Sequence, residues 1–492
     1  MTNKNLLKNT LLVAASASII TLAGCNNDDD DKAQLRVIHA SPDAPAVNVL
    51  LDSSTAISDL DYADSSGFQS INAGTRDITV EAIIPGGNAN VISVPDFPLA
   101  KDSRSTVIAV DNTASIEAFV ADESAANPAS GEVAVAVVHA SPDAPAVDVY
   151  VTAPGTDVSD PNVQPSFTFD FKDPAVDAGA LPAATYDITV TLSGTKTVAY
   201  NISDVDLSPF AGQKLLIAAV STTSATNKEA SPIKLLVATD DAQVVLLDED
   251  TVSGARVVHV SPDADAAASG PVEVLANSVS LNLTSLELID SFRYTEIAPP
   301  VGNPPLPLTS DGSFVLVPPA DDFIFDVAID EGAIVFTSDE VSLAQGTEYT
   351  VIAAGLVSAE PAFGLLITED NNRSIITQAT VKVVHGAPAA GPVSVYVTPA
   401  GDFSKADVEN GLAGEPLLEN FEFGTITDYV AVPPGDYDIR VVPNSLGVAA
   451  INVEGATLPA GVVATVIARQ PNDANALPDD EPTDFNIIVL TN

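Results

Sequence analysis

The four histidines are the residues of this chain whose type is best suited to catalysis or metal binding. Two of them open identical copies of the stretch HASPDAPAV, at residues 39–47 and 139–147. In each copy a serine and an aspartate follow within five residues, and these are the residue types of a Ser-His-Asp hydrolase. The other two open related stretches, HVSPDADA and HGAPAAGPV. The histidines are His39, His139, His259 and His385.

The spacing argues against hydrolysis. A catalytic histidine needs a nucleophile on one side of its ring and an orienting acid on the other, which a short loop fixed by proline does not offer. The fourth copy has Ala387 and Ala389 in place of the serine and the aspartate, and no G-x-S-x-G elbow occurs. We therefore expect no enzyme. We expect each histidine instead to hold a loop corner through a hydrogen bond from its ring to loop backbone.

The serine-proline-aspartate segment is typical of a type I turn between two strands, with proline at the second position. The residue before the second proline is pushed into extended geometry. We interpret the repeated residues as a structural motif: His39, Pro42, Asp43, His139, Pro142, Asp143, His259, Pro262, Asp263, His385 and Pro388.

Metal binding is a second chemistry that histidines and carboxylates could support. One histidine per copy and no nearby cysteine make a poor zinc site. Calcium prefers carboxylate oxygens, which are plentiful here. If the turn acid and the closing acids of a repeat met at one pole, they could hold calcium between domains. The candidates are Asp43, Asp122, Glu123, Asp143, Asp240, Asp241, Asp263, Glu369 and Asp370. No cofactor is expected, and calcium is the alternative.

The elements around the histidines recur in a fixed order. Each histidine ends an apolar run (LRVIH, VAVVH, ARVVH, VKVVH), and a second strand-like run follows the turn. Three further strand signatures follow in every copy, and the histidines are spaced by 100, 120 and 126 residues. Short strands in this order predict tandem β-domains of about seven strands, as in immunoglobulin-like sandwiches.

The expected fold is all-β, with four tandem immunoglobulin-like antiparallel β-sandwich domains. Their expected ranges are 34–124, 133–241, 254–370 and 379–492. The linkers are short, and those at 240–255 and 369–379 carry apolar residues that could add a strand. One short helix is predicted at 404–410, with Ser404 as its cap and Gly411 as its end.

The N-terminus predicts the cellular address. Residues 1–24 have a lysine-bearing start and an apolar stretch, as a secretory signal peptide does. The ending LAGC resembles the lipobox of bacterial lipoproteins, which implies lipidation of Cys25 and anchoring to a membrane. Asn26 favours the outer membrane, and residues 25–33 read as an acidic tether. Whether the protein faces the periplasm or the exterior stays open.

Cys25 is the only cysteine, so no disulfide can stabilise the fold. The chain has 19 lysines and arginines against 67 aspartates and glutamates, for a net charge of −48. Such a charge argues against nucleic-acid binding, because phosphates would repel it.

RVIHASPDAPAVNV, VVHASPDAPAVDVYV and the downstream LPAATYDITV resemble the family of domains of unknown function numbered 4397. The resemblance implies a β-sandwich fold and an exported setting, and it brings no known activity. We expect a non-enzymatic envelope lipoprotein, either a structural spacer or a rod that binds a protein or a glycan. The alternative is a calcium-dependent or small-ligand-binding envelope protein.

Overall fold

The computed structural model describes residues 31–173, 176–265, 270–298, 313–329, 333–471 and 485–491. The predicted signal peptide (1–24), Cys25 and most of the predicted tether lie outside these residues. The tether prediction is too long at its end, because Lys32 and Ala33 already belong to strand β1 (Lys32–His39). Within the described ranges, no helix is long and apolar enough to cross a membrane.

The first repeat is a sandwich of two four-stranded sheets. Its first sheet has the order β4-β1-β7-β8, with β4 (Gln69–Asn72), β7 (Arg104–Val110) and β8 (Glu117–Asp122). Its second sheet has the order β3-β2-β5-β6, with β3 (Ser54–Leu60), β2 (Val47–Leu51), β5 (Gly74–Ala82) and β6 (Ala89–Leu99). Side chains alternate between the two faces of each strand, and those turned inward form an apolar core.

The other three repeats follow the same plan. In the second, the sheets are β12-β9-β15-β16-β17 and β11-β10-β13-β14. Their bounds are β9 (Glu132–His139), β10 (Val147–Thr152), β11 (Phe167–Phe169), β12 (Val176–Pro182), β13 (Thr185–Leu192), β14 (Val198–Asp206), β15 (Lys214–Ser221), β16 (Ile233–Ala238) and β17 (Gln243–Leu246). The 240–255 linker thus adds a strand, β17, to the sheet.

In the third repeat, the sheets are β21-β18-β26-β27, with β22 paired to β18, and β20-β19-β23-β24, with β25 paired to β23. Their bounds are β18 (Ser253–His259), β19 (Val272–Ser278), β20 (Leu283–Phe292), β21 (Ile297–Ala298), β22 (Val315–Val317), β23 (Ala320–Ile329), β24 (Ala333–Thr337), β25 (Val341–Leu343), β26 (Glu348–Ala354) and β27 (Gly364–Asp370).

In the fourth repeat, the sheets are β31-β28-β34-β35 and β30-β29-β32-β33. Their bounds are β28 (Ala379–His385), β29 (Val393–Pro399), β30 (Leu418–Phe421), β31 (Val430–Val432), β32 (Gly435–Pro443), β33 (Ile451–Leu458), β34 (Val463–Arg469) and β35 (Asn486–Thr491). Helix α3 (Lys405–Glu409) forms where the sequence predicts one, and Ser404 and Asp407 make its capping box. Helix α1 (Ala225–Ala230) was not predicted.

The all-β sandwich fold predicted from the sequence is confirmed, with one difference of strand direction. The strand that ends in the histidine pairs in parallel with the late strand of its repeat: β1 with β7, β9 with β15, β18 with β26 and β28 with β34. Between these two strands the chain visits the second sheet twice and adds an antiparallel edge strand, such as β4, to the first sheet before it returns in the original direction. The other strand-to-strand pairings within the described ranges are antiparallel, as expected.

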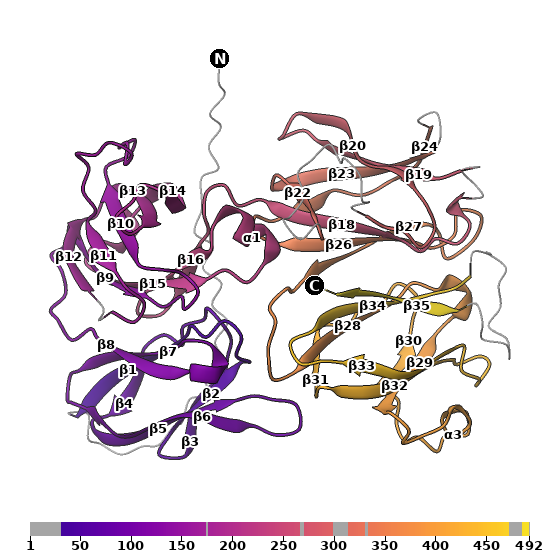
Figure 1. The fold of residues 1–492 in the computed structure, drawn as a ribbon, viewed down its shortest axis with the longest axis horizontal. Coiled ribbons are helices and arrows are strands. Elements are labelled where there is room, and N and C mark those ends of the chain that lie inside the picture. The colour runs from indigo at the N-terminus through magenta and orange to yellow at the C-terminus, as the bar shows by residue number, and fades with distance from the viewer. Residues whose placement is uncertain are drawn as a thin grey trace. The chain divides into compact units, whose positions relative to one another are not determined.

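The sandwiches are packed in pairs. The chain divides into two compact units, one of residues 1–83, 87–222 and 230–250 and the other of 84–86, 223–229 and 251–492. In the first unit, the first sheet of sandwich one packs face to face on the first sheet of sandwich two (Figure 1). Ile38 and Ile108 meet Val138 and Leu216 in this contact. We call it the seam of the first unit.

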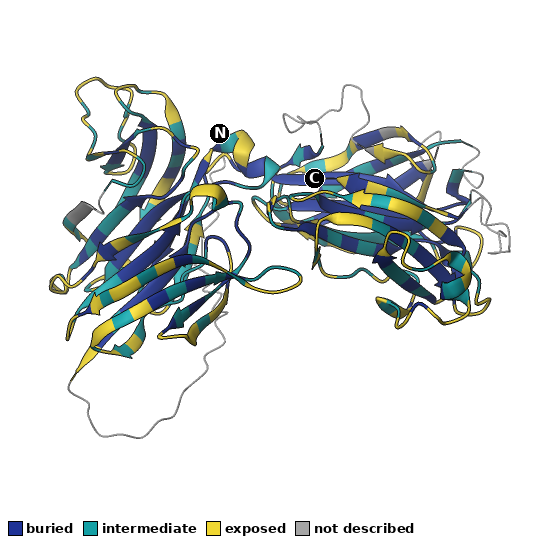
Figure 2. Ribbon diagram, turned by 60° about the horizontal axis from the view of Figure 1, so that its bottom comes forward, coloured by how far each residue is buried: buried dark blue, intermediate teal, exposed yellow. Residues whose placement is uncertain are grey.

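The seam forms because its strands are apolar on both faces. On β1, Leu35 and Val37 face the core of their own sandwich, whereas Ile38 faces the seam. Such continuous apolar runs are typical of sheets that are covered on both sides. Figure 2 shows the buried strands in the interior of the layered stack. Each unit therefore has four sheet layers and three apolar layers between them.

The second unit repeats this arrangement. Its seam joins β18 and β26 of sandwich three to β28 and β34 of sandwich four, through Val258, Ile352, Val384 and Ile467. Separate cores fill the two sandwiches on either side. Calcium held between domains would require a pole of one sandwich to face the next, but within each unit sheet faces, not poles, make the contact.

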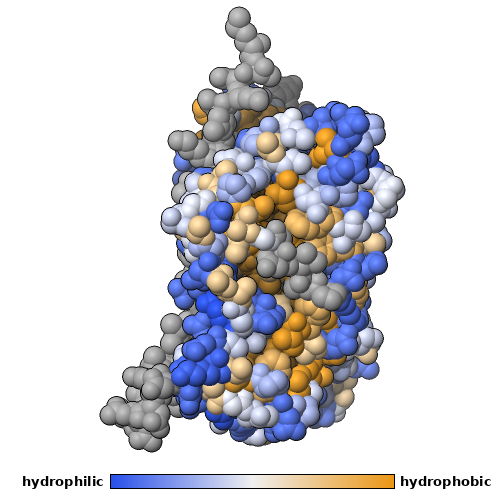
Figure 3. Space-filling view, turned by 90° about the vertical axis from the view of Figure 1, so that its left-hand side faces the viewer, coloured by the Kyte–Doolittle hydropathy of each residue, from blue (hydrophilic) through white to orange (hydrophobic). Residues whose placement is uncertain are grey.

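Away from the seams, the surface is mixed. Figure 3 looks at the side of the first unit that lies on the left in Figure 1, and hydrophobic side chains there reach the surface among hydrophilic ones. Scattered exposed apolar side chains are normal for soluble domains.

Candidate functional site

Each histidine lies at the end of the first strand with both ring nitrogens engaged. At His39, Nδ1 accepts the backbone N–H of Ser41 (3.3 Å), and Nε2 lies 2.9 Å from the carbonyl oxygen of Pro45. Because a backbone N–H can only donate, Nδ1 carries no proton, so Nε2 carries it and donates to the carbonyl. The ring is a neutral imidazole that ties the strand to the following loop.

The same pair of bonds occurs at His139 and His385. Their Nε2 atoms lie 3.1 Å from the Pro145 oxygen and 2.8 Å from the Gly391 oxygen. Their Nδ1 atoms accept the backbone N–H groups two residues further on. At His259, Nδ1 again accepts such an N–H, but Nε2 lies 3.3 Å from the Asp265 carboxylate and lacks hydrogen-bond alignment.

An aromatic side chain completes each corner. The rings of Tyr62, Phe171, Tyr294 and Phe423 stand at a steep angle to the four histidine rings, with centroids 6.0–6.3 Å apart. The residue after each aromatic has a positive φ and donates its N–H to the carbonyl oxygen of the histidine. These residues are Ala63, Lys172, Thr295 and Gly424. This half of the corner was not predicted from the sequence, although an aromatic residue recurs there in every repeat.

The corner is closed to catalysis. The four rings are at most 2% exposed, and burial lowers the pKa of the His139 and His385 imidazoles below the usual range. A general base needs a free ring nitrogen that reaches the substrate or a nucleophile. Here one nitrogen accepts a backbone N–H and the other faces a carbonyl or carboxylate oxygen.

The turn acids also have structural partners. Asp43 accepts hydrogen bonds from the backbone N–H (2.7 Å) and the hydroxyl (2.8 Å) of Thr113, in the loop after β7. Asp263 accepts from the backbone of Val357 (2.9 Å) and from both the N–H (3.0 Å) and the hydroxyl (2.6 Å) of Ser358. Asp143 is exposed. In two repeats the turn acid therefore ties two loops at one pole of the sandwich.

The calcium sites predicted from the sequence do not assemble, because the closing acids lie at the other pole. Ser105 pairs with both Asp122 and Leu35, near the start of β1, whereas Asp43 follows the end of β1. A strand of eight residues spans about 25 Å. The register is the same in the second and third repeats, so Asp143 is separated from Asp240 and Asp241, and Asp263 from Glu369 and Asp370. Within the described ranges, no group of three potential metal ligands occurs.

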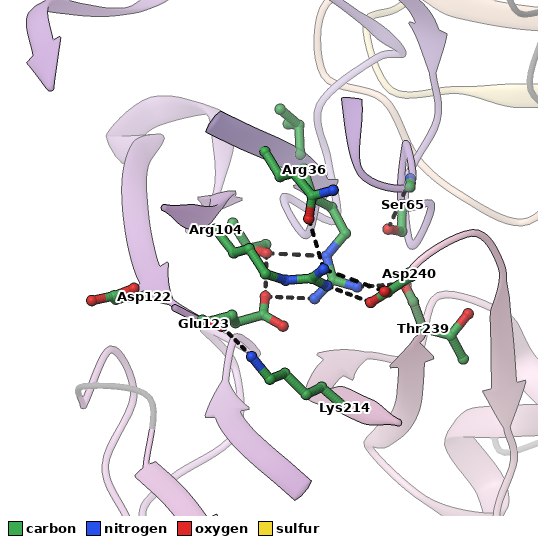
Figure 4. Close-up of polar contacts among 12 residues, drawn as sticks. Arg36, Ser65, Arg104, Asp122, Glu123, Lys214, Thr239 and Asp240 are labelled. Atoms are coloured by element: carbon green, nitrogen blue, oxygen red, sulfur yellow. Dashed lines mark hydrogen bonds and ion pairs between the residues drawn. The ribbon is translucent and has the colours of Figure 1, made fainter. Parts of the chain in front are cut away.

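Two of the closing acids, Glu123 and Asp240, instead belong to an ion network at the seam (Figure 4). Arg36 is 1% exposed, and its guanidinium pairs with Glu123 (2.6 Å) and donates to the Thr106 hydroxyl (3.0 Å). It also reaches across the seam to the carbonyl oxygen of Thr239 (2.7 Å) in sandwich two. Burial lowers the pKa of the guanidinium, and the charge of Glu123 opposes that shift.

Two more cations cross the same seam. Arg104 pairs with the Asp240 carboxylate, and Lys214 donates to the backbone oxygen of Glu123 (2.9 Å). The guanidinium carbons of Arg36 and Arg104 lie 4.5 and 4.1 Å from the centroid of Phe68. The seam thus joins apolar packing in its middle to charge pairs at one end.

The second unit has a related network. Arg256 pairs with Asp370 (3.1 Å) and donates to the hydroxyl of Thr350 (2.8 Å), and the Tyr429 hydroxyl also donates to Asp370 (3.2 Å). Lys382, from sandwich four, lies beside them. A cavity of about 510 Å³ opens at this end of the seam. These cations were not predicted from the sequence. The available signal was a charged residue three places before the histidine, inside an otherwise apolar strand.

Several solved structures resemble parts of the chain. A candidate cell adhesion protein from Bacteroides uniformis is 12% identical, with a TM-score of 0.18, and the match covers 49% of this chain and 99% of that one. A streptococcal ancillary pilin is 10% identical, with a TM-score of 0.14, and the match covers 68% of this chain and 97% of that one. Identities and scores this low carry no argument about function.

No curated protein matches the chain. A family model matches residues 33–150 and 253–396, which together make up more than half of the sequence. The first range starts in β1 and the second starts at β18, and each includes a histidine corner. The chain therefore belongs to the family described as domain of unknown function DUF4397.

Proposed function

We propose that this protein is a non-enzymatic lipoprotein of the bacterial outer membrane. In this role its sandwich pairs form a spacer that presents a binding surface to a protein or a glycan. The observation that carries the proposal is the seam. Two sandwiches joined by a buried apolar layer and by polar contacts across the seam move as one block, unlike sandwiches on free linkers.

The chemistry of the histidines supports a non-enzymatic role. They are the residues best suited to catalysis by type, yet their rings are buried and bonded to backbone. A protein that used these repeats for hydrolysis would need at least one ring open to substrate. The repeated stretch supports the sandwich corner instead.

The N-terminal sequence supports the anchor. The stretch LAGC after an apolar segment is the feature that predicts lipidation of Cys25. Several acyl chains bound together hold a protein firmly at a bilayer, at about 0.8 kcal/mol per buried methylene. The net charge of −48 keeps the remainder of the chain away from anionic lipid headgroups.

The experiment uses the full chain, with its signal, expressed in a Gram-negative bacterium. Radioactive palmitate should label the wild type and not Cys25→Ser, and the label should appear in the outer-membrane fraction. An unlabelled wild-type protein would overturn the anchor.

A panel of esters and a fluorophosphonate probe test the non-enzymatic part. Turnover that disappears in His39→Gln, with the fold retained by circular dichroism, would overturn that part of the proposal.

A further inference from the structure

The cavity of the second unit lies where sandwich three meets sandwich four. Sandwich three contributes the end of β27 (residues 367–370) and Asn371, and sandwich four contributes Lys382 and residues 426–429. Three carboxylates line it, those of Glu369, Asp370 and Asp428, against one ammonium group. The local charge therefore favours a cationic guest.

The partners of these groups show which of them remain available. Lys382 donates to the Thr368 hydroxyl (2.6 Å) and to the Glu369 backbone oxygen (2.5 Å), and its nitrogen lies 4.2 Å from the centre of the Tyr429 ring. Asp370 is held by Arg256. The carboxylates of Glu369 and Asp428 form no hydrogen bond or ion pair with any residue of the described ranges.

The first unit contains a similar arrangement, with an arginine at the position of Lys382. The registers of the strands make Arg36 equivalent to Lys382, and Thr239 equivalent to Glu369. Arg36 bonds the backbone oxygen of Thr239 just as Lys382 bonds that of Glu369. Each of these two cations also lies over the aromatic ring of its own sandwich, Phe68 in the first unit.

Phe68, however, lies against a second cation. The guanidinium of Arg104 lies 4.1 Å from its centroid and pairs with Asp240 across the seam. Arg104 pairs in register with Gln34 on β1, and the equivalent place opposite Thr380 on β28 is Val463. In the second unit a neutral residue thus stands where the first unit has its second cation.

The second unit also has acidic residues at two positions where the first unit has none. Glu369 stands where the first unit has Thr239, and Asp428 stands before Tyr429 where Gly67 stands before Phe68. The second unit therefore has a cavity, an aromatic ring and two additional carboxylates at the position that Arg104 helps to fill in the first.

We propose that this cavity binds the guanidinium group of an arginine side chain presented by a partner protein. A guanidinium is planar, so it can stack on the Tyr429 ring as Arg104 does on Phe68, and it can bind carboxylates through paired N–H donors. Glu369 and Asp428 supply those acceptors. The inference deepens the proposed binding role and rests on it only for the source of the arginine.

The test titrates the full chain with three capped amino acids and follows heat or chemical shifts. The probes are Nα-acetyl-arginine amide, the lysine analogue and the citrulline analogue, which keeps the shape of arginine without its charge. Arginine should bind at least tenfold more tightly than citrulline, and more tightly than lysine. Equal binding of arginine and citrulline, or no binding of arginine, would overturn the proposal. An arginine-containing capped tripeptide should bind at least as well as the single residue, and failure of the tripeptide alone would overturn the protein source.

Variants separate the site from the rest of the acidic surface. The double variant Glu369→Gln, Asp428→Asn changes exposed side chains and should weaken arginine binding at least tenfold. Asp241→Asn removes an exposed acid in the first unit and should leave binding unchanged. Unchanged binding in the double variant would refute the site. Val463→Arg should abolish binding by filling the cavity from within. These readouts do not depend on lipidation, so the anchor and the cavity can fail separately.

Discussion

The buried pair of Arg36 and Glu123 permits a sharp test of how the seam is stabilised. The two side chains are 1% and 5% exposed and lie 2.6 Å apart. Glu123→Gln would leave the guanidinium buried without its counter-charge. Removing one partner of a buried pair costs about 3–5 kcal/mol, because desolvation of the remaining charge is no longer offset. We expect a loss of this size in the free energy of unfolding of the first unit.

The second sandwich shows what can replace Arg36 and the hydroxyl it contacts. Ala136 and Leu216 stand at the positions of Arg36 and Thr106 there, so an apolar version of this sheet already exists in the same chain. The double variant Arg36→Met, Glu123→Leu should therefore recover most of the lost stability, since replacing both charges by apolar groups is often neutral.

Hydrogen exchange followed by mass spectrometry can measure this effect locally in the full chain. Glu123→Gln should raise exchange in peptides from β1 and also from β16, because Arg36 also bonds to Thr239 just after that strand. The matched control is Asp52→Asn, which breaks a pair with Arg76 whose side chains are 47% and 29% exposed. The control should cost much less than Glu123→Gln, because solvent screens an exposed pair. A cost for Glu123→Gln as small as the control, or exchange changes confined to β1, would refute the reasoning.

Three further predictions concern the corners and their acids. Burial lowers the folded-state pKa of His139 and His385, so their contribution to stability is full above pH 6.5 and declines as the pH falls. The decline is at most about 1.4 kcal/mol per pH unit for each ring. In the double variant His139→Gln, His385→Gln, the midpoint of urea unfolding should therefore depend less on pH between pH 7 and 5. Gly424 has a φ of 79°, so Gly424→Ala should lower the free energy of unfolding by about 1 kcal/mol, whereas Ala63→Gly, at a φ of 61°, should be neutral or stabilising; chemical denaturation tests both. Since the turn acids and the closing acids lie at opposite poles, calcium or a chelator should leave the melting temperature unchanged, and a rise with calcium would contradict the register.

The sandwiches can be predicted from the sequence because short local patterns specify their strands. Alternating apolar residues, proline turns and the recurring histidine fix the strands and their order. The parallel pairing of β1 with β7 depends on where the chain returns after the second sheet, which no local pattern specifies. The predicted calcium sites failed for the same reason, since the pole at which β8 ends follows from that pairing.

The seam could not be predicted from the sequence for a different reason. Strands that are apolar on both faces indicate cover on both sides, but they do not identify what provides it. Arg36 and Arg256 interrupt such strands, and taken alone they look like edge positions. Only the structure shows that a neighbouring sandwich covers the outer face. The same holds for the aromatic half of the corner, because Tyr62 and Phe423 lie in loops that share little other sequence.

The seams imply that the unit of stability is a pair of sandwiches. A chain that ends at residue 131 would present Ile38, Ile108 and Val110 to water, and all three are at most 1% exposed in the intact seam. Contiguous apolar surface of this kind drives association. We therefore expect residues 31–131 to aggregate or to associate with a second copy through the same face, whereas residues 31–250, which include both sides of the seam, should remain monomeric. Light scattering of the two fragments at matched concentration decides between them. A stable monomer of 31–131 would mean that the seam contributes little, and the block-like spacer would lose its physical basis.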